Sequence, residues 1–125
     1  MTKTLLALMC LAVSGVAYAA PTDERPGVCY MFKGDKLLNK GVCVVSTGDG
    51  AGGMYEALSY NGTDYLIETA LCHNKKTDEY TECGTDLNGL PAKFYNRNLF
   101  YKRMEGDRVG ELTCYLSKKI DICYK

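Results

Sequence analysis

The chain has 125 residues, of which 15 are basic and 15 are acidic. This balance gives no charge-based reason to expect nucleic acid or an anionic membrane as the partner. The length suits a single domain with a modest core. Seven cysteines occur with only one histidine and without a C-x-x-C spacing, which argues against a zinc site, and we expect neither a metal nor a cofactor.

Residues 1–19 are typical of a secretory signal peptide. Lys3 gives a positive start, residues 5–16 are largely apolar, and a small-x-small cleavage site ends at Ala19. The apolar stretch is too short to span a membrane. We therefore predict cleavage after Ala19, which leaves residues 20–125 as one domain in the periplasm or outside the cell.

Six cysteines remain once the signal peptide, which contains Cys10, is removed. An even number of cysteines in an exported chain is typical of a disulfide framework. Their positions favour three local pairs, although spacing alone leaves other connectivities open: Cys29 with Cys43, Cys72 with Cys83, and Cys114 with Cys123.

Turn dipeptides alternate with short aromatic and β-branched runs through most of the chain. Asn61-Gly62 and Asn88-Gly89 are strong hairpin signals, and Gly34-Asp35 and Lys118-Lys119 separate similar runs. We therefore expect an all-β or β-dominated fold in which antiparallel hairpins form a small sheet or barrel, held by three disulfides.

Two segments are expected to depart from this pattern. Residues 96–108 could form one short helix that ends at Gly106. Residues 73–82 are polar and charged, and we expect them to form an exposed loop.

The register of the central hairpin follows from its turn. With Asn61-Gly62 as a two-residue turn, Leu58 faces Tyr65 and Glu56 faces Ile67. Alternation then places four side chains on one apolar face: Leu58, Tyr60, Tyr65 and Ile67.

The same reasoning applies to the disulfides. A turn at Lys118-Lys119 places Cys114 directly opposite Cys123. A two-residue turn at Gly34-Asp35 places Lys40, and not Cys43, opposite Cys29. A bulge is therefore required in that hairpin, and we expect Gly41 to be the extra residue.

Gly48, Gly50 and Gly53 form a G-x-G-x-x-G motif after an apolar run, as in a dinucleotide-binding site. The Asn61-Gly62 turn follows too soon to allow the crossover helix that such a site requires. We therefore expect no dinucleotide, and interpret the glycines as a flexible or sharply kinked connection between the strand that carries Cys43 and the next hairpin.

His73 is the only histidine and therefore the only imidazole available for catalysis. The serines considered as nucleophiles, Ser46, Ser59 and Ser117, lie in or at the end of predicted strands, and no G-x-S-x-G motif is present. Disulfide formation would leave no thiol nucleophile. We interpret His73 as an exposed loop residue and assign no catalytic residue.

The stretch from residue 93 to residue 103 mixes basic and aromatic side chains. This mixture would suit a contact surface for another protein or for an anionic glycan, whereas nucleic acid is unlikely for a domain that is not basic. A strand with inward aromatic and outward charged side chains would give a similar pattern. The candidate surface residues are Lys93, Tyr95, Arg97, Tyr101, Lys102 and Arg103.

Four stretches resemble a group of small, cysteine-containing exported proteins of Gram-negative bacteria: GVCYMFKGDKLLNKGVCVVS, GDGAGGMY, YLIET and LTCYLSKKIDICYK. The resemblance implies an envelope location and disulfides. In size and build the chain is also similar to periplasmic lysozyme inhibitors.

The sequence therefore favours a non-enzymatic exported binding protein of the bacterial envelope, as an inhibitor or neutraliser of a hydrolase or toxin, or as a surface interaction module. The alternative is a small secreted hydrolase or toxin that uses His73.

Overall fold

The computed structural model describes residues 23–50, 53–106 and 108–125, so the predicted signal peptide and its cleavage site lie outside the described residues. The described part of the chain forms antiparallel strands and contains no helix, which confirms the predicted fold class. The strands are β1 (Asp23–Lys33), β2 (Lys36–Gly50), β3 (Gly53–Tyr60), β4 (Thr63–Asn74), β5 (Glu79–Leu87), β6 (Leu90–Pro91), β7 (Lys93–Arg97), β8 (Leu112–Leu116) and β9 (Asp121–Tyr124).

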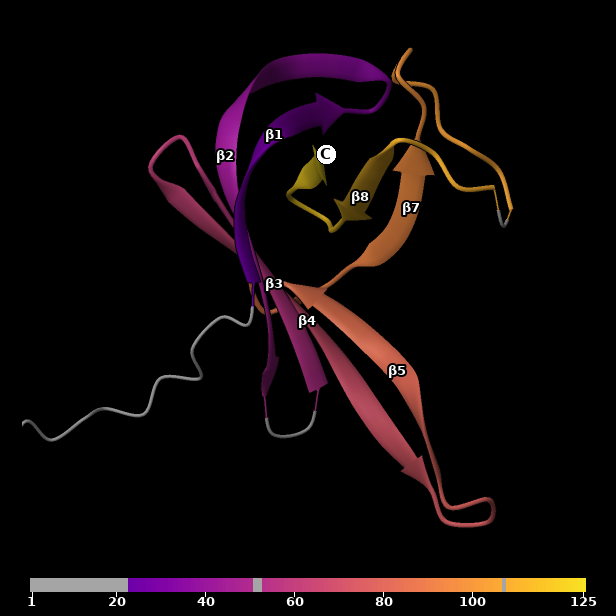
Figure 1. Ribbon diagram of the computed structural model, residues 1–125. Helices are drawn as coiled ribbons and strands as arrows, with labels where there is room; N and C mark the ends of the chain where they lie inside the picture. The colour runs from indigo at the N-terminus through magenta and orange to yellow at the C-terminus, as the bar shows by residue number, and fades with distance from the viewer. Residues whose placement is uncertain (1–22, 51–52, 107) are drawn as a thin grey trace, which may run out of the picture.

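The strands form one sheet with the order β6-β5-β4-β3-β2-β1-β9-β8-β7. Its two edge strands, β6 and β7, are consecutive in the chain and are joined by Ala92 alone, whose amide donates a hydrogen bond to the carbonyl of Thr85 on β5. The sheet therefore curls into a nearly closed barrel (Figure 1). Curling of this kind shields most strand edges from solvent.

The hairpin turns follow the predicted chemistry. Asn61 and Gly62 have φ values of 52° and 76°, and Asn88 and Gly89 have values of 49° and 78°. A positive φ at both central residues defines the type I′ turn, whose twist matches that of paired strands. The predicted register of the β3–β4 hairpin is confirmed, with Leu58 opposite Tyr65 and Glu56 opposite Ile67.

The sheet buries apolar side chains on both of its faces. The inner core fills the barrel and includes Cys29, Cys43, Val45, Leu58, Tyr60, Ile67, Leu87, Tyr115 and Ile122. The outer core lies on the other face of β1, β9 and β8, with Tyr95 and Tyr101 packed against it, and consists of Tyr30, Phe32, Leu112, Cys114 and Cys123.

The three predicted disulfides are confirmed as Cys29–Cys43, Cys72–Cys83 and Cys114–Cys123. Cys114 lies directly opposite Cys123 with a Cα–Cα distance of 4.0 Å, in the register expected from the Lys118-Lys119 turn.

The expected bulge in the first hairpin lies elsewhere. Phe32 pairs with Leu37 and Met31 pairs with Asn39, so the extra residue is Leu38, close to the turn, and not Gly41. Gly41 instead lies opposite Cys29, and a Cβ atom there would be 3.2 Å from the ring of Tyr60. The missing side chain therefore makes room for an inner-core tyrosine.

The expected loop at residues 73–82 is largely a strand pair. β4 and β5 continue past the barrel as a long hairpin (Figure 1), in which His73 pairs with Tyr80 and the Cys72–Cys83 disulfide joins the two strands. The residues are exposed, as expected, but the disulfide and the backbone ladder hold them in an extended conformation.

The glycine motif also lies mainly in strands. β2 runs to Gly50 and β3 pairs with it in antiparallel fashion from Gly53, so no crossover helix follows the motif. A Cβ atom at Gly48 would be 2.5 Å from the ring of Tyr55, and one at Gly53 would be 2.2 Å from the carbonyl oxygen of Thr69. These two glycines therefore permit close packing between strands.

Candidate functional site

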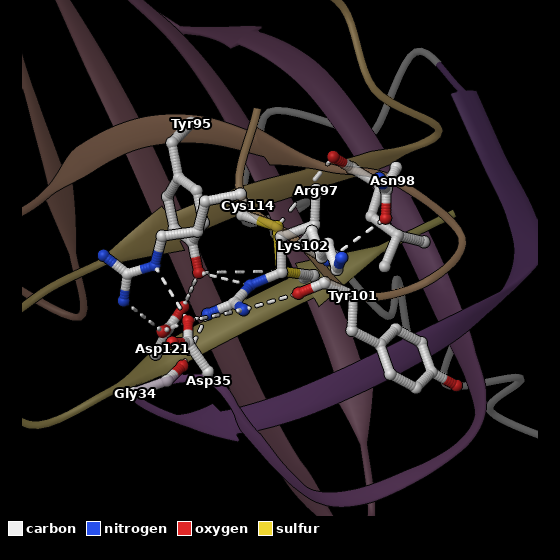
Figure 2. Close-up of a disulfide and its surroundings, with 12 residues drawn as sticks. Gly34, Asp35, Tyr95, Arg97, Asn98, Tyr101, Lys102, Cys114 and Asp121 are labelled. Atoms are coloured by element: carbon white, nitrogen blue, oxygen red, sulfur yellow. Dashed lines mark hydrogen bonds and ion pairs between the residues drawn. A yellow bond between two sulfur atoms is a disulfide. The ribbon is translucent and has the colours of Figure 1, made fainter. Parts of the chain in front are cut away.

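The side chain of Arg97 is completely buried at the end of β7, with 0% exposed surface. Its Nε donates to the hydroxyl of Tyr95 at 3.0 Å, and its Nη1 donates to the carbonyl of Tyr101 at 2.9 Å. Its Nη2 donates to the carbonyl of Gly34 at 2.8 Å and to Oδ2 of Asp121 at 3.1 Å (Figure 2). The planar guanidinium group thus connects β7 with three other parts of the chain.

Asp121 supplies the opposite charge in this network. It is only 5% exposed, accepts a hydrogen bond from the Tyr95 hydroxyl, and lies 3.7 Å from Nη2 of Arg103. Burial, followed by the hydrogen bond to Asp121, raises the pKa of Tyr95 above its usual value. The Tyr95 hydroxyl therefore remains a hydrogen-bond donor to the carboxylate at neutral pH.

The chain after Arg97 forms a turn in place of the expected helix. Oδ1 of Asn98 accepts hydrogen bonds from the amides of Phe100 at 2.9 Å and Lys102 at 3.1 Å. Tyr101 has a φ of 65° and therefore cannot continue a right-handed helix. The local Asn98 hydrogen bonds thus compete successfully with the helical ones.

Tyr101 anchors the far side of this turn. Its ring lies 5.7 Å from that of Tyr30 and 5.5 Å from that of Phe32 in the outer core. The guanidinium of Arg97 lies 3.9 Å from the centre of the Phe32 ring. The turn is therefore held on both sides, by Asn98 and by Tyr101 (Figure 2).

Two large apolar side chains lie between these anchors and point to solvent. Leu99 is 53% exposed and Phe100 is 84% exposed. We call Leu99 and Phe100 the apolar tip. Lys102 and the partly exposed Arg103 follow the tip after Tyr101, and Nζ of Lys40 lies 3.4 Å from the hydroxyl of Tyr101. Asp35 lies 3.9 Å from Nε of Arg103 and offsets part of this positive charge.

The structure divides the predicted contact surface into separate parts. Lys93 is exposed at the start of β7, at the opposite end of that strand from the apolar tip. Tyr95 and Tyr101 are half-buried, and only Lys102 and Arg103 are exposed near the tip. The prediction that Arg97 contacts a partner is wrong, because the side chain is buried.

The alternation of inward aromatic and outward charged side chains is not observed either. Arg97 and Tyr95 lie on the outer-core face of β7 and Arg97 is buried there, whereas Phe94 and Phe100 are exposed. Sequence reasoning also missed Leu99 and Asp121. The signal that could have located the tip is Asn98, a residue that often forms local turns by side-chain hydrogen bonds.

His73 lies on β4 and not in a loop. Its Nε2 is 2.7 Å from Oδ1 of Asp78, and its ring centre is 4.9 Å from that of Tyr80. This pair provides an imidazole and a carboxylate, which are two of the three groups of a hydrolytic triad.

The serines considered as nucleophiles are not placed beside this pair. Ser59 donates to Asp64, and Ser117 accepts the amide of Ile120 in the β8–β9 turn. Ser46 on β2 pairs with Ala57 on β3, which pairs with Leu66 on β4. His73 lies seven residues beyond Leu66 on β4, which is a distance of about 23 Å along the strand. The six cysteines of the described chain are all in disulfides.

Comparisons with known proteins leave the family open. No family model and no solved structure matches the chain. The chain is similar to the pre-glycoprotein polyprotein GP complex of Ippy mammarenavirus, with 39% identity over 70 residues. The aligned region covers 49% of this chain but only 14% of the polyprotein. No helix in the described ranges is long and apolar enough to cross a membrane. Fold and site therefore define a class only: the described residues form a small, disulfide-bonded, all-β domain with an exposed apolar turn.

Proposed function

We propose that the protein is a non-enzymatic exported binding protein that recognises another protein through the apolar tip. The observation that carries this proposal is the exposed Phe100 in a turn that the Asn98 side chain holds at the amide of Phe100 and the buried Arg97 holds at the carbonyl of Tyr101. An aromatic side chain on a fixed backbone loses little conformational entropy on binding, so more of its burial energy contributes to affinity.

The shape and charge of the tip indicate the kind of partner. An exposed apolar turn fits a concave apolar site, and the neighbouring Lys102 favours acidic groups around that site. Concave sites of this kind on proteins are commonly active-site clefts. These features support an inhibitor or neutraliser of a hydrolase or toxin over a general surface interaction module, and over a binder of anionic glycans.

The cysteines and the predicted signal peptide support a proposed location for this activity. Three disulfides are compatible with an oxidising compartment. Together with the predicted signal peptide, they support a place in the periplasm or outside the cell. The resemblance to exported proteins of Gram-negative bacteria agrees with this proposal.

The test is a comparative pull-down with the oxidised chain of residues 20–125 from bacterial envelope extract and host secretions. A Leu99→Ser/Phe100→Ser variant removes the tip. Tyr80→Ser removes another exposed aromatic side chain, from the β4–β5 hairpin. The proposal expects a partner that binds the wild type and Tyr80→Ser but not the tip variant.

In the same experiment, the His73→Ala variant distinguishes a binding protein from a hydrolase or toxin that uses His73. A binding protein should keep its fold and its affinity for the partner in this variant. Partner capture that does not depend on the tip would contradict the proposal. A hydrolytic activity of the wild type that His73→Ala abolishes would instead favour the hydrolase or toxin.

A further inference from the structure

The barrel is incompletely filled at the end remote from the apolar tip. The inward-facing row that crosses β2, β3, β4 and β5 at this end consists of Asp49, Met54, Thr69 and Thr85. In the next row, Ile67 and Leu87 fill the core. Because three of these four side chains are short and polar, a hollow of about 480 Å³ remains. Its volume lies in the usual range for small-ligand sites, about 300–1,000 Å³.

A carboxylate lies at the inner side of this hollow. Glu56 on β3 accepts a hydrogen bond at Oε1 from the hydroxyl of Tyr115, at 3.3 Å, and another at Oε2 from the hydroxyl of Tyr124. Burial raises the pKa of both tyrosines, and the charge and hydrogen bond of Glu56 raise it further. Both hydroxyls therefore remain donors at neutral pH, which matches a carboxylate that only accepts.

Apolar and aromatic groups lie beside this carboxylate. The rings of Phe94 and Tyr115 both line the hollow, with their centres 5.7 Å apart and inclined by 57°, and Met54 lines it as well. A ring face attracts a cation, and a thioether side chain suits a hydrocarbon chain.

The charged side chains that line the hollow are all acidic. Asp49, Glu56 and Glu82 line it, and none of its described lining residues is a lysine, an arginine or a histidine. No ion pair found in the described part of the chain involves these three carboxylates. Their spacing does not suit a metal ion, because the described residues contain no group of three metal-binding side chains.

We propose that this hollow binds an organic cation, namely an alkyl ammonium or guanidinium group. The charged head would bind Glu56, and the hydrocarbon chain would lie against Met54 and Phe94. A carboxylate held by two hydroxyl donors is preorganised for a charge-assisted hydrogen bond. The same chemistry occurs in a free amine and in a lysine or arginine side chain of a partner protein.

Titrations followed by NMR of the ¹⁵N-labelled, oxidised chain test this inference. The probes are butylguanidinium, its neutral isostere butylurea, and the capped peptide acetyl-Gly-Arg-Gly-amide. We expect butylguanidinium, but not butylurea, to shift the amide signals of Met54, Glu56 and Thr69. Peptide binding at the same amides would indicate a side chain as the ligand, whereas exclusion of the peptide would indicate a free amine.

Two matched variants locate the charge that matters. Glu56→Gln keeps the shape of the side chain and one accepting oxygen for a tyrosine hydroxyl but removes the charge, and we expect it to weaken butylguanidinium binding about tenfold or more. Glu68→Gln removes the same charge from an exposed position on β4 and should leave binding unchanged. The inference is overturned if butylguanidinium causes no shifts, if butylurea binds equally well, or if Glu56→Gln binds like the wild type.

This inference is independent of the proposed function. Phe100→Ser, which removes the apolar tip, should bind butylguanidinium like the wild type. A loss of binding in this variant would contradict the separation of the two sites.

Discussion

Arg97 and Gly34 are 63 positions apart in the chain, yet Nη2 of Arg97 donates a hydrogen bond of 2.8 Å to the carbonyl oxygen of Gly34. The contact joins the end of β7 to the β1–β2 turn. Because the same guanidinium group also binds Tyr101 and Asp121, the apolar tip depends on a residue that no partner would touch. Arg97 therefore links the stability of the fold to the conformation of the proposed binding surface.

Removal of the buried guanidinium should be costly. Arg97→Met retains much of the side-chain volume but leaves the buried Asp121 without its main partner, and we expect a loss of about 3–5 kcal/mol in the free energy of unfolding. Arg103→Met is the control, because Arg103 is 44% exposed, and it should cost less than about 1 kcal/mol. Urea unfolding measures both. Equal losses would contradict the assigned role of Arg97.

Two glycines that flank Ala70 should respond in opposite ways to alanine. Gly53 and Gly84 both pair with Ala70, from opposite sides of β4. A Cβ atom at Gly53 would be 2.2 Å from the carbonyl oxygen of Thr69, whereas one at Gly84 has no neighbour within 4 Å. Gly53→Ala should therefore cost about 1–3 kcal/mol, and Gly84→Ala should be neutral or stabilising by about 0.5 kcal/mol. Thermal unfolding measures the stability of both variants, and a Gly84→Ala variant that is less stable than Gly53→Ala would contradict the prediction.

The three disulfides should differ in their accessibility to a reductant. Cys72 and Cys83 are exposed in the β4–β5 hairpin, whereas the cysteines of the other two bridges are buried. Mild reduction should therefore open Cys72–Cys83 first and leave the barrel folded. Loss of this bridge should cost at most about 3 kcal/mol of chain entropy. Alkylation and peptide mapping would identify the first thiols, and early labelling of Cys29 or Cys114 would contradict the expectation.

Stability should decrease at alkaline pH. Burial raises the pKa of Tyr95, Tyr115 and Tyr124 above the ordinary value for tyrosine. A raised pKa in the folded state contributes stability below the unfolded-state pKa, and this contribution is lost as the pH rises above about 10. We expect these three tyrosines to ionise only well above the ordinary tyrosine pKa or on unfolding. An ultraviolet titration, with Tyr→Phe variants to assign the signals, in which these three tyrosines ionise near pH 10 in the folded protein would disprove this.

Much of the fold was predictable because its signals are local. Asn61 and Gly62 adopt positive φ values, which asparagine and glycine tolerate better than other residues. This turn alone sets the register of β3 and β4. Cys114 and Cys123 are brought together by a turn between them, so their pairing also follows from neighbouring residues.

The sites were not predictable because they depend on distant partners. Arg97 can be buried because Asp121 and the carbonyl of Gly34, which belong to other hairpins, accept hydrogen bonds from its guanidinium group. Glu56 acquires its place in the hollow through Tyr115 and Tyr124, which are 59 and 68 positions away. The helix expected over residues 96–108 was wrong for a local and a distant reason: the Asn98 side chain binds the amides of Phe100 and Lys102, and Tyr101 packs on Tyr30 and Phe32.

The central claim is that the apolar tip is fixed before any partner binds. Backbone ¹⁵N relaxation of the free protein tests this claim most directly, because it reports the order parameters of Leu99 and Phe100. The hydrogen bonds of Asn98 and Arg97 predict values of about 0.85, similar to those of β7. Values below about 0.6 at Leu99 and Phe100, with β7 ordered, would show a flexible turn and contradict the claim.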